Sequence, residues 1–167
     1  MAGENLGLLR KNYLFAKLTD DELGELEPYL ESRSYNAAEF VVKEGDPGDS
    51  LYLVASGGVN VTKNPDGHFL SYLGSGGYFG EMALFMPNST RTANCVAALP
   101  TKCLILQKDA LEKYAGQYPV PGNKIYREII RALAERLAAT SGDLAMLMRS
   151  QVKDQVDVSA IMAKLKK

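Results

Sequence analysis

Between residues 32 and 106 the sequence consists of short β-prone segments separated by glycine-rich turns. The turns combine Gly with Pro, Asn, Asp and Ser, which adopt the backbone conformations that a chain reversal needs, and they fall at residues 45–49, 56–58, 64–67 and 74–77. The other segments predict strands at residues 39–43, 50–55, 58–63, 69–73, 93–97 and 101–107. Strands so short and so evenly interrupted favour a small antiparallel barrel or roll over a parallel sheet. A barrel of this size can enclose one small ligand.

Helical patterns precede the β-rich stretch. Residues 5–18 carry a weakly periodic apolar pattern, and Thr19-Asp-Asp-Glu22 forms the pattern of a capping box. The helix that it begins has an apolar face of Leu23, Leu26 and Leu30. The predicted fold class is α+β, mainly β, with an antiparallel β-roll or jelly-roll barrel, N-terminal helices and a long C-terminal dimerisation helix.

The pattern is helical again after Asp109. Pro119 and Pro121 are expected to interrupt it, and a long helix is expected from Asn123, followed by a short helix at residues 158–165. The long helix carries residues at alternating spacings of three and four, the pattern of a coiled coil: Ile130, Leu133, Leu137, Thr140, Leu144 and Leu147. We therefore predict a homodimer through residues 125–152. Thr140 places a hydroxyl in this seam, which indicates either control of the helix register or contact with a ligand.

Composition limits the class of function. The formal net charge is −1, so no overall positive field attracts nucleic acid or an acidic membrane. No stretch approaches the ~18 apolar residues that span a bilayer, and the N-terminus lacks the basic start and apolar run of a signal peptide. We expect a cytoplasmic protein that binds neither nucleic acid nor membranes.

Residues suited to metal or redox chemistry are scarce. His68 is the only histidine, and Cys95 and Cys103 are too few and too far apart for a metal site. Cys95 alternates with alanines in a predicted strand, which favours a buried, reduced thiol. A metal-dependent oxygenase on a similar barrel would need several histidines. We predict no catalytic residues, no metal and no cofactor, and hence no enzymatic activity.

Residues 79–93 combine three kinds of anion-binding group. Gly80 allows close approach of the backbone, and residues 82–86 have the length of one helical turn, whose N-terminal amides favour an anion. Arg91 offers a forked donor, and Glu81 accepts hydrogen bonds from hydroxyls. The combination suits a phosphorylated sugar. The alternative is an ordinary surface ion pair of Glu81 and Arg91 beside a glycine turn.

These residues resemble a known family. Phe79-Gly80-Glu81-Met82-Ala83-Leu84 followed by Arg91-Thr92-Ala93 is similar to the phosphate-binding cassette of cyclic nucleotide-binding domains. The resemblance extends to residues 44–52 and 58–61 and covers roughly residues 12–140. It implies N-terminal helices at residues 1–31, a cyclic nucleotide-binding β-roll at 32–122 with its cassette at 79–93, and a C-terminal helix, hinge and tail at 123–167.

The resemblance also implies a role for each site residue. Gly80 and Glu81 would bind the ribose, and Arg91, Thr92 and the amides of Ala83 and Leu84 would bind the phosphate. Val61 and Leu70 would lie against the base, although ordinary core packing explains these two equally well. Gly45 and Gly48 would shape the pocket without touching the ligand.

The long helix carries a second resemblance. Arg136-Leu-Ala-Ala-Thr140-Ser141 followed by Leu144-Ala145 is similar to the dimer helix of the catabolite activator family. It implies that Thr140 contacts the base in its own subunit and Ser141 contacts it in the partner subunit. This favours cyclic AMP, whereas a threonine at position 92 also suits cyclic GMP. Cyclic AMP is the preferred prediction because Thr92 can serve the phosphate instead.

The predicted function is a regulatory sensor for a cyclic nucleotide that switches the position of the C-terminal dimer helix. Residues 143–167 are too few for the winged helix-turn-helix of the activator family. We therefore expect either a separate effector protein as partner or a truncated sensor half of a transcription regulator or other effector. A cyclic GMP sensor, and a dimeric adaptor whose barrel has lost ligand binding, are the alternatives.

Overall fold

The chain divides into two compact units. The computed structural model describes residues 5–64, 66–86, 88 and 90–164, and the division falls between Ile129 and Ile130. Each unit is described by itself. In the described part of the chain, no helix is long and apolar enough to cross a membrane.

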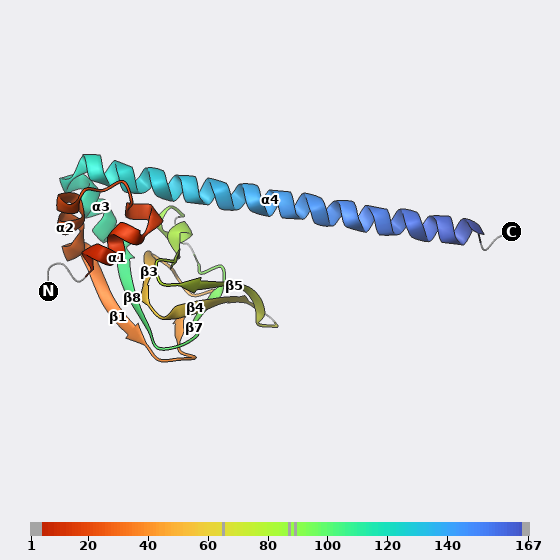
Figure 1. Ribbon diagram of the computed structural model, residues 1–167, viewed down its shortest axis with the longest axis horizontal. Helices are drawn as coiled ribbons and strands as arrows, with labels where there is room; N and C mark the ends of the chain where they lie inside the picture. The colour runs from red at the N-terminus through yellow and green to blue at the C-terminus, as the bar shows by residue number, and fades with distance from the viewer. Residues whose placement is uncertain (1–4, 65, 87, 89, 165–167) are drawn as a thin grey trace. The chain divides into compact units, whose positions relative to one another are not determined.

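Two four-stranded antiparallel sheets form the β-roll of the first unit (Figure 1). One sheet has the order β1 (Leu30–Tyr35), β8 (Thr101–Gln107), β3 (Ser50–Ser56) and β6 (Tyr78–Phe79). The other has the order β2 (Phe40–Val42), β7 (Asn94–Ala97), β4 (Gly58–Lys63) and β5 (His68–Gly74). The neighbours in both orders pair antiparallel. The predicted mainly β roll is confirmed.

The core of the roll is made by side chains from both sheets. Buried apolar residues of β3 and β8 meet those of β4 and β7 in one cluster. Full burial of a Val, Ile or Phe side chain favours the folded state by roughly 1.5–3 kcal/mol. The members of the cluster are Tyr35, Tyr52, Val54, Val59, Phe79, Cys95, Ala97, Cys103 and Ile105. Both cysteines are buried, free thiols.

Short helices precede the roll. They are α1 (Leu6–Lys11), the 3₁₀ helix η1 (Tyr13–Phe15), α2 (Asp20–Leu26) and the 3₁₀ helix η2 (Glu27–Tyr29). The capping box is confirmed, because the Glu22 amide donates to the Thr19 hydroxyl and the Thr19 amide donates to the Glu22 carboxylate at 2.8 Å.

Two strands, two helix boundaries and one predicted helix differ from the sequence prediction. Leu30, predicted on the helix, begins β1, an edge strand whose four central residues are polar and exposed and therefore lack the alternating pattern. β6 has two residues, too few for a pattern. Pro119 and Pro121 lie in the first turn of α4 (Pro119–Lys164). The backbone N–H groups of a first turn have no hydrogen-bond partner within the helix, so proline, which lacks this group, is tolerated there. No separate helix forms at 158–164, because α4 continues through these residues.

The start of α4 is fixed to the rest of the first unit. The Lys124 ammonium donates to both carboxylate oxygens of Glu22 at 2.6 and 2.7 Å, and the Tyr114 hydroxyl of α3 (Lys108–Gln117) donates to the Glu22 carbonyl at 2.9 Å. α3 and α4 also approach closely. A Cβ on Gly122 would lie 2.6 Å from both Cα and Cβ of Ala115.

The second unit consists of α4 from Ile130 onward. Of the predicted seam, Ile130, Leu137 and Thr140 are exposed and Leu133 is half-buried in the single chain. Leu144 and Leu147 lie outside the residues whose side chains the structure describes. A row of exposed apolar side chains on a long helix fits the predicted homodimer, which stays a prediction.

We expect Gly122→Ala to destabilise the protein, because the new methyl group would overlap Ala115. The expected loss is about 1–3 kcal/mol of unfolding free energy, as for other overpacked sites, and urea denaturation measures it. Gly116→Ala on α3 is the matched control, since its Cβ meets no atom within 4 Å. This control should gain up to about 1 kcal/mol from helix propensity. Equal effects of the two substitutions would contradict the close helix contact.

Candidate functional site

The segment that begins the predicted cassette is shaped by one left-handed glycine. β6 ends at Phe79, Gly80 adopts φ 84°, and the chain then forms the 3₁₀ helix η3 (Glu81–Leu84). A Cβ on Gly80 would lie 2.6 Å from the Ser50 carbonyl oxygen and 2.8 Å from Nη1 of Arg91. The position therefore requires glycine for both its backbone conformation and its close contacts. The predicted helical turn is present, but it is 3₁₀ and ends at Leu84.

Glu81 and Arg91 are both buried, at 3% and 8% exposure. Both lie close enough to Cys95 to act on its thiol. Burial raises the pKa of Cys95 to about 12, Arg91 opposes the rise and Glu81 adds to it. The two charged side chains thus lie in one region of the roll, and the alternative of a surface ion pair is excluded by their burial.

The Arg91 guanidinium is held in a narrow slot. Its Nη1 donates to the Ser50 carbonyl and its Nη2 to the Ser50 hydroxyl, both at 2.9 Å. The guanidinium carbon lies 5.4 Å from the centre of the Tyr52 ring, a cation–π contact. A Cβ on Gly48 would lie 2.7 Å from Nε of Arg91. These contacts fix the direction of the guanidinium and use two of the five N–H donors that an arginine has.

Ser50 and Tyr52 are the contributors that sequence reasoning missed. Ser50 and Tyr52 are alternate residues of β3, and alternate residues share one face of a strand. The turn glycine Gly48 was assigned to shaping the pocket, and the structure shows in addition that it touches Arg91. The period of two along residues 50–54 indicates which residues share a face of the strand, but it does not indicate that Ser50 binds an arginine.

The remaining predicted phosphate ligands lie beside Arg91 and along η3. Ala83 and Leu84 are buried, and the Ala83 amide donates to the Gly80 carbonyl at 3.2 Å, which closes the 3₁₀ turn. Thr92 is exposed, and its carbonyl accepts a hydrogen bond from Lys63 at 2.7 Å. Residues 87 and 89 of the cassette lie outside the described residues. The phosphate contacts of these groups stay predictions.

The predicted base contacts lie on β4, β5 and α4. Val61 is half-buried and packs against the core cluster, whereas Leu70 is 50% exposed at a bulge between the pairs Val61–Ser71 and Thr62–Phe69. Thr140 and Ser141 are exposed on α4 in the second unit. The Thr140 hydroxyl donates to the Arg136 carbonyl at 2.9 Å. Contact of these four residues with a base stays a prediction.

A cleft of about 430 Å³ borders the cassette, with Gly48, Ala83 and Thr90 among its lining residues. A larger cleft of about 490 Å³ lies between the start of β1 and the start of α3, where Tyr29, Glu31 and Lys108 line it. None of the predicted site residues lines the larger cleft, so we place the site at the cassette. Within the described residues, no group of three or more His, Cys, Asp or Glu side chains is arranged to hold a metal ion.

The amino-acid sequence matches the family described as cyclic nucleotide-binding domain over residues 32–118, which is more than half of the chain. The chain belongs to the cyclic nucleotide-binding domain family. The resemblance read from residues 79–93 is thereby confirmed, and the match covers the whole of that segment.

Three relatives are similar to this chain in amino-acid sequence. Glutaminase 2 of Bradyrhizobium diazoefficiens is 35% identical over 83% of this chain and 22% of its own length. The cGMP-dependent protein kinase, isozyme 1, of Drosophila melanogaster is 32% identical over 82% of this chain and 18% of its own. The CRP-like cAMP-activated global transcriptional regulator of Mycobacterium tuberculosis is 28% identical over 89% of this chain and 66% of its own. The chain thus spans less than two thirds of each relative.

The fold is shared with a solved activator. The crystal structure of the Thermus thermophilus catabolite activator protein superposes with a TM-score of 0.73 at 30% identity, over 81% of this chain and 63% of that one. The mainly β fold with helices is therefore shared with a protein of known structure.

We expect Gly80→Ala to lose more stability than Gly76→Ala. Both glycines have positive φ, so each alanine carries about 1–2 kcal/mol of backbone strain. A Cβ at Gly76 meets nothing within 4 Å, whereas one at Gly80 meets Ser50 and Arg91. The difference between the two unfolding free energies, from urea denaturation, should be about 1–3 kcal/mol. Equal losses of stability would contradict the close packing of Gly80 against Ser50 and Arg91.

Proposed function

We propose that this chain is a regulatory sensor that binds one cyclic nucleotide, cyclic AMP in preference to cyclic GMP, and transmits its binding to α4 without bond chemistry. The observation that carries the proposal is the joint burial of Glu81 and Arg91, with Gly80, the residue before Glu81, packed against the Arg91 guanidinium. A buried carboxylate and a buried guanidinium are costly unless they have a task or full compensation.

The two side chains have complementary tasks toward a ribose-phosphate. Arg91 keeps its guanidinium fixed on Ser50 and directs its other donors to the phosphate, where a forked donor fits two oxygens. Glu81 accepts a hydrogen bond from the ribose hydroxyl. Neither contact distinguishes adenine from guanine, because both nucleotides share the ribose and the cyclic phosphate.

Thr140 supports the preference for cyclic AMP. Its hydroxyl proton is already engaged with the Arg136 carbonyl, so the oxygen presents lone pairs. Lone pairs suit the adenine amino group, which is a donor, rather than the guanine oxygen, which is an acceptor. The relative named as cAMP-activated agrees with this choice. The relative named as cGMP-dependent, together with Thr92, keeps cyclic GMP as the alternative.

A contact between the cassette and α4 supports the switch. The Phe85 ring, directly after η3, packs edge-on against Tyr126 of α4, with centroids 6.1 Å apart and ring planes at 68°. A nucleotide that reorders η3 therefore acts on the first turns of α4. The ligand must bind one arrangement more tightly than another, since equal affinity shifts no population.

The proposed output is a change in a homodimer formed by residues 125–152. The effector is then a separate protein or a further part of a longer chain, as in the glutaminase, kinase and regulator relatives, whose lengths exceed this chain. The domain itself is proposed to act by binding alone.

We expect Arg91→Ala to weaken cyclic AMP binding at least about 100-fold, the scale for removing one partner of a buried charge pair. Arg91→Lys should also weaken binding, because lysine keeps the charge but lacks the forked donor. Isothermal titration calorimetry with cyclic AMP and with cyclic GMP measures this effect and the preference between the nucleotides. Circular dichroism checks that each variant is folded, and Arg91→Lys keeps the charge in the slot.

Arg10→Ala is the control, because Arg10 is an exposed arginine in a surface pair with Asp20. Its affinity should equal that of the wild type. Unchanged affinity in Arg91→Lys would remove Arg91 from the site, and tighter binding of cyclic GMP would reverse the proposed preference.

We expect Leu137→Glu to raise the dimer dissociation constant at least about tenfold, because it places a charge in an apolar seam position. Leu137 is 69% exposed in the single chain. Sedimentation velocity measures the change, and Ala138→Glu, also exposed on α4 but off the seam, is the control. A monomeric wild type, or equal effects of both substitutions, would contradict the dimer.

A further inference from the structure

The main chain that carries Arg91 is joined to the turn after β2 by hydrogen bonds outside the named strands. The Arg91 amide donates to the Asp46 carbonyl at 2.8 Å, and the Gly45 amide donates to the Arg91 carbonyl at 2.9 Å. Pro47 and Thr90 continue this pairing as an isolated antiparallel bridge. The position of Arg91 therefore depends on the turn at residues 44–47.

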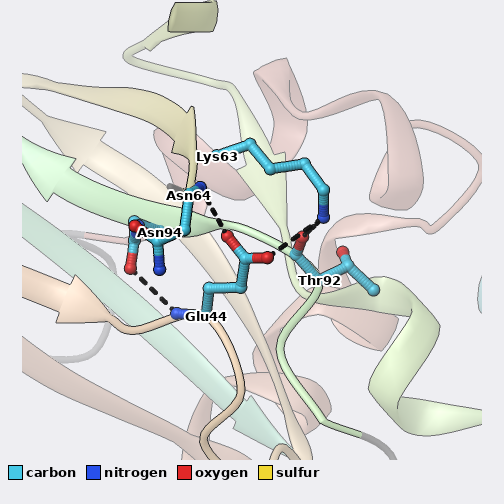
Figure 2. Close-up of polar contacts among 5 residues, drawn as sticks. All are labelled: Glu44, Lys63, Asn64, Thr92 and Asn94. Carbon is cyan, nitrogen blue, oxygen red and sulfur yellow. Dashed lines mark hydrogen bonds and ion pairs between the residues drawn. The ribbon is translucent and has the colours of Figure 1, made fainter. Parts of the chain in front are cut away.

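An ion pair crosses this junction (Figure 2). Lys63, the last residue of β4, donates from Nζ to the Thr92 carbonyl at 2.7 Å and to Glu44 Oε1 at 3.2 Å. Glu44 Oε2 accepts from the Asn64 amide at 2.9 Å, and the Glu44 amide donates to the Asn94 side-chain oxygen at 2.9 Å. Lys63 thus connects the turn after β2 with the residue that follows Arg91.

We propose that the Glu44–Lys63 ion pair positions Arg91 for the ligand phosphate by holding the turn at 44–47 and residues 91–94 together. This inference rests on the proposed function. Glu44 and Lys63, referred to below as the clamp, act through the main chain of Arg91 and Thr92, and neither is assigned a contact with the nucleotide.

The state of the clamp at neutral pH follows from its contacts. The Asn64 amide and Lys63 hold the pKa of Glu44 below its ordinary value, so its carboxylate is charged. The Glu44 side chain is 22% exposed and the Lys63 side chain is 50% exposed. Ion pairs that are partly exposed contribute modestly to stability. The bond from Lys63 to the Thr92 carbonyl adds a direct hold on the main chain next to Arg91.

The direction in which removal of the Glu44 carboxylate changes nucleotide affinity distinguishes positioning from simple electrostatics. A nucleotide phosphate is an anion, so removing a nearby carboxylate charge would strengthen its binding if charge alone mattered. Positioning predicts the opposite, because loss of the carboxylate frees Lys63 and loosens residues 91–94. The two explanations therefore give opposite results for one substitution.

The test uses Glu44→Gln and Lys63→Met in the full chain, with cyclic AMP titrated by calorimetry. Each variant should weaken binding about three- to fivefold, the upper range for a partly exposed pair. The double variant should match the single ones, since both remove the same interaction. Lys63→Arg should bind cyclic AMP with an affinity within about twofold of that of the wild type, because arginine keeps the positive charge and the N–H donors.

Lys17→Met is the matched control, since Lys17 is exposed on the segment before α2. Its affinity should equal that of the wild type. The proposal is overturned if Glu44→Gln binds cyclic AMP as tightly as the wild type or more tightly. It is also overturned if Lys63→Arg weakens binding as much as Lys63→Met does.

A second measurement needs no ligand and so separates this inference from the proposed function. In nucleotide-free protein, hydrogen exchange at the Arg91 and Gly45 amides, resolved by NMR, should quicken about three- to fivefold in both clamp variants and stay unchanged in Lys17→Met. A wild type that binds no cyclic nucleotide would refute the proposed function alone. Unchanged exchange at both amides would refute the clamp.

Discussion

The fold around the site depends on the burial of one guanidinium. A buried cation costs several kcal/mol unless it is compensated by hydrogen bonds and an oriented environment. Here Ser50 supplies a carbonyl and a hydroxyl, and Tyr52 supplies the face of its ring. Gly48 and Gly80 leave the space that the guanidinium needs. The glycines at positions 48 and 80 follow from this requirement.

The slot that holds the Arg91 guanidinium connects the two sheets with the cassette and with α4. Ser50 and Tyr52 belong to one sheet, Arg91 precedes β7 of the other, and Tyr52 stacks on Phe79 at a centroid distance of 5.0 Å. The ring contact of Phe85 with Tyr126 then connects the cassette to the first turns of α4. A ligand that engages Arg91 therefore acts on a continuous set of packed groups within the first unit.

Much of this arrangement was predictable from the sequence, for reasons that can be named. The turns and β-prone segments predicted six of the strands because each strand is flanked by residues with special backbone preferences, whereas the polar edge strand β1 and the two-residue β6 carry no such pattern. The cassette was predicted because residues 79–93 resemble the phosphate-binding cassette of cyclic nucleotide-binding domains. Ser50 was missed because a serine in a strand has no distinctive signal, and its role exists only once Arg91 folds back onto it. Pro119 and Pro121 were read as breaks because a proline at a helix start and one between helices look alike in sequence.

The central claim, that Arg91 receives the phosphate of a cyclic nucleotide, is tested most directly by NMR. The side-chain Nε–H resonance of Arg91, assigned by its absence in the spectrum of Arg91→Lys, can be followed in ¹⁵N-labelled protein during titration with cyclic AMP. We predict a saturable shift of this resonance with the same midpoint as the ligand's own ³¹P signal. A ³¹P signal that saturates while the Arg91 resonance stays in place would contradict the account, because the nucleotide would then bind elsewhere.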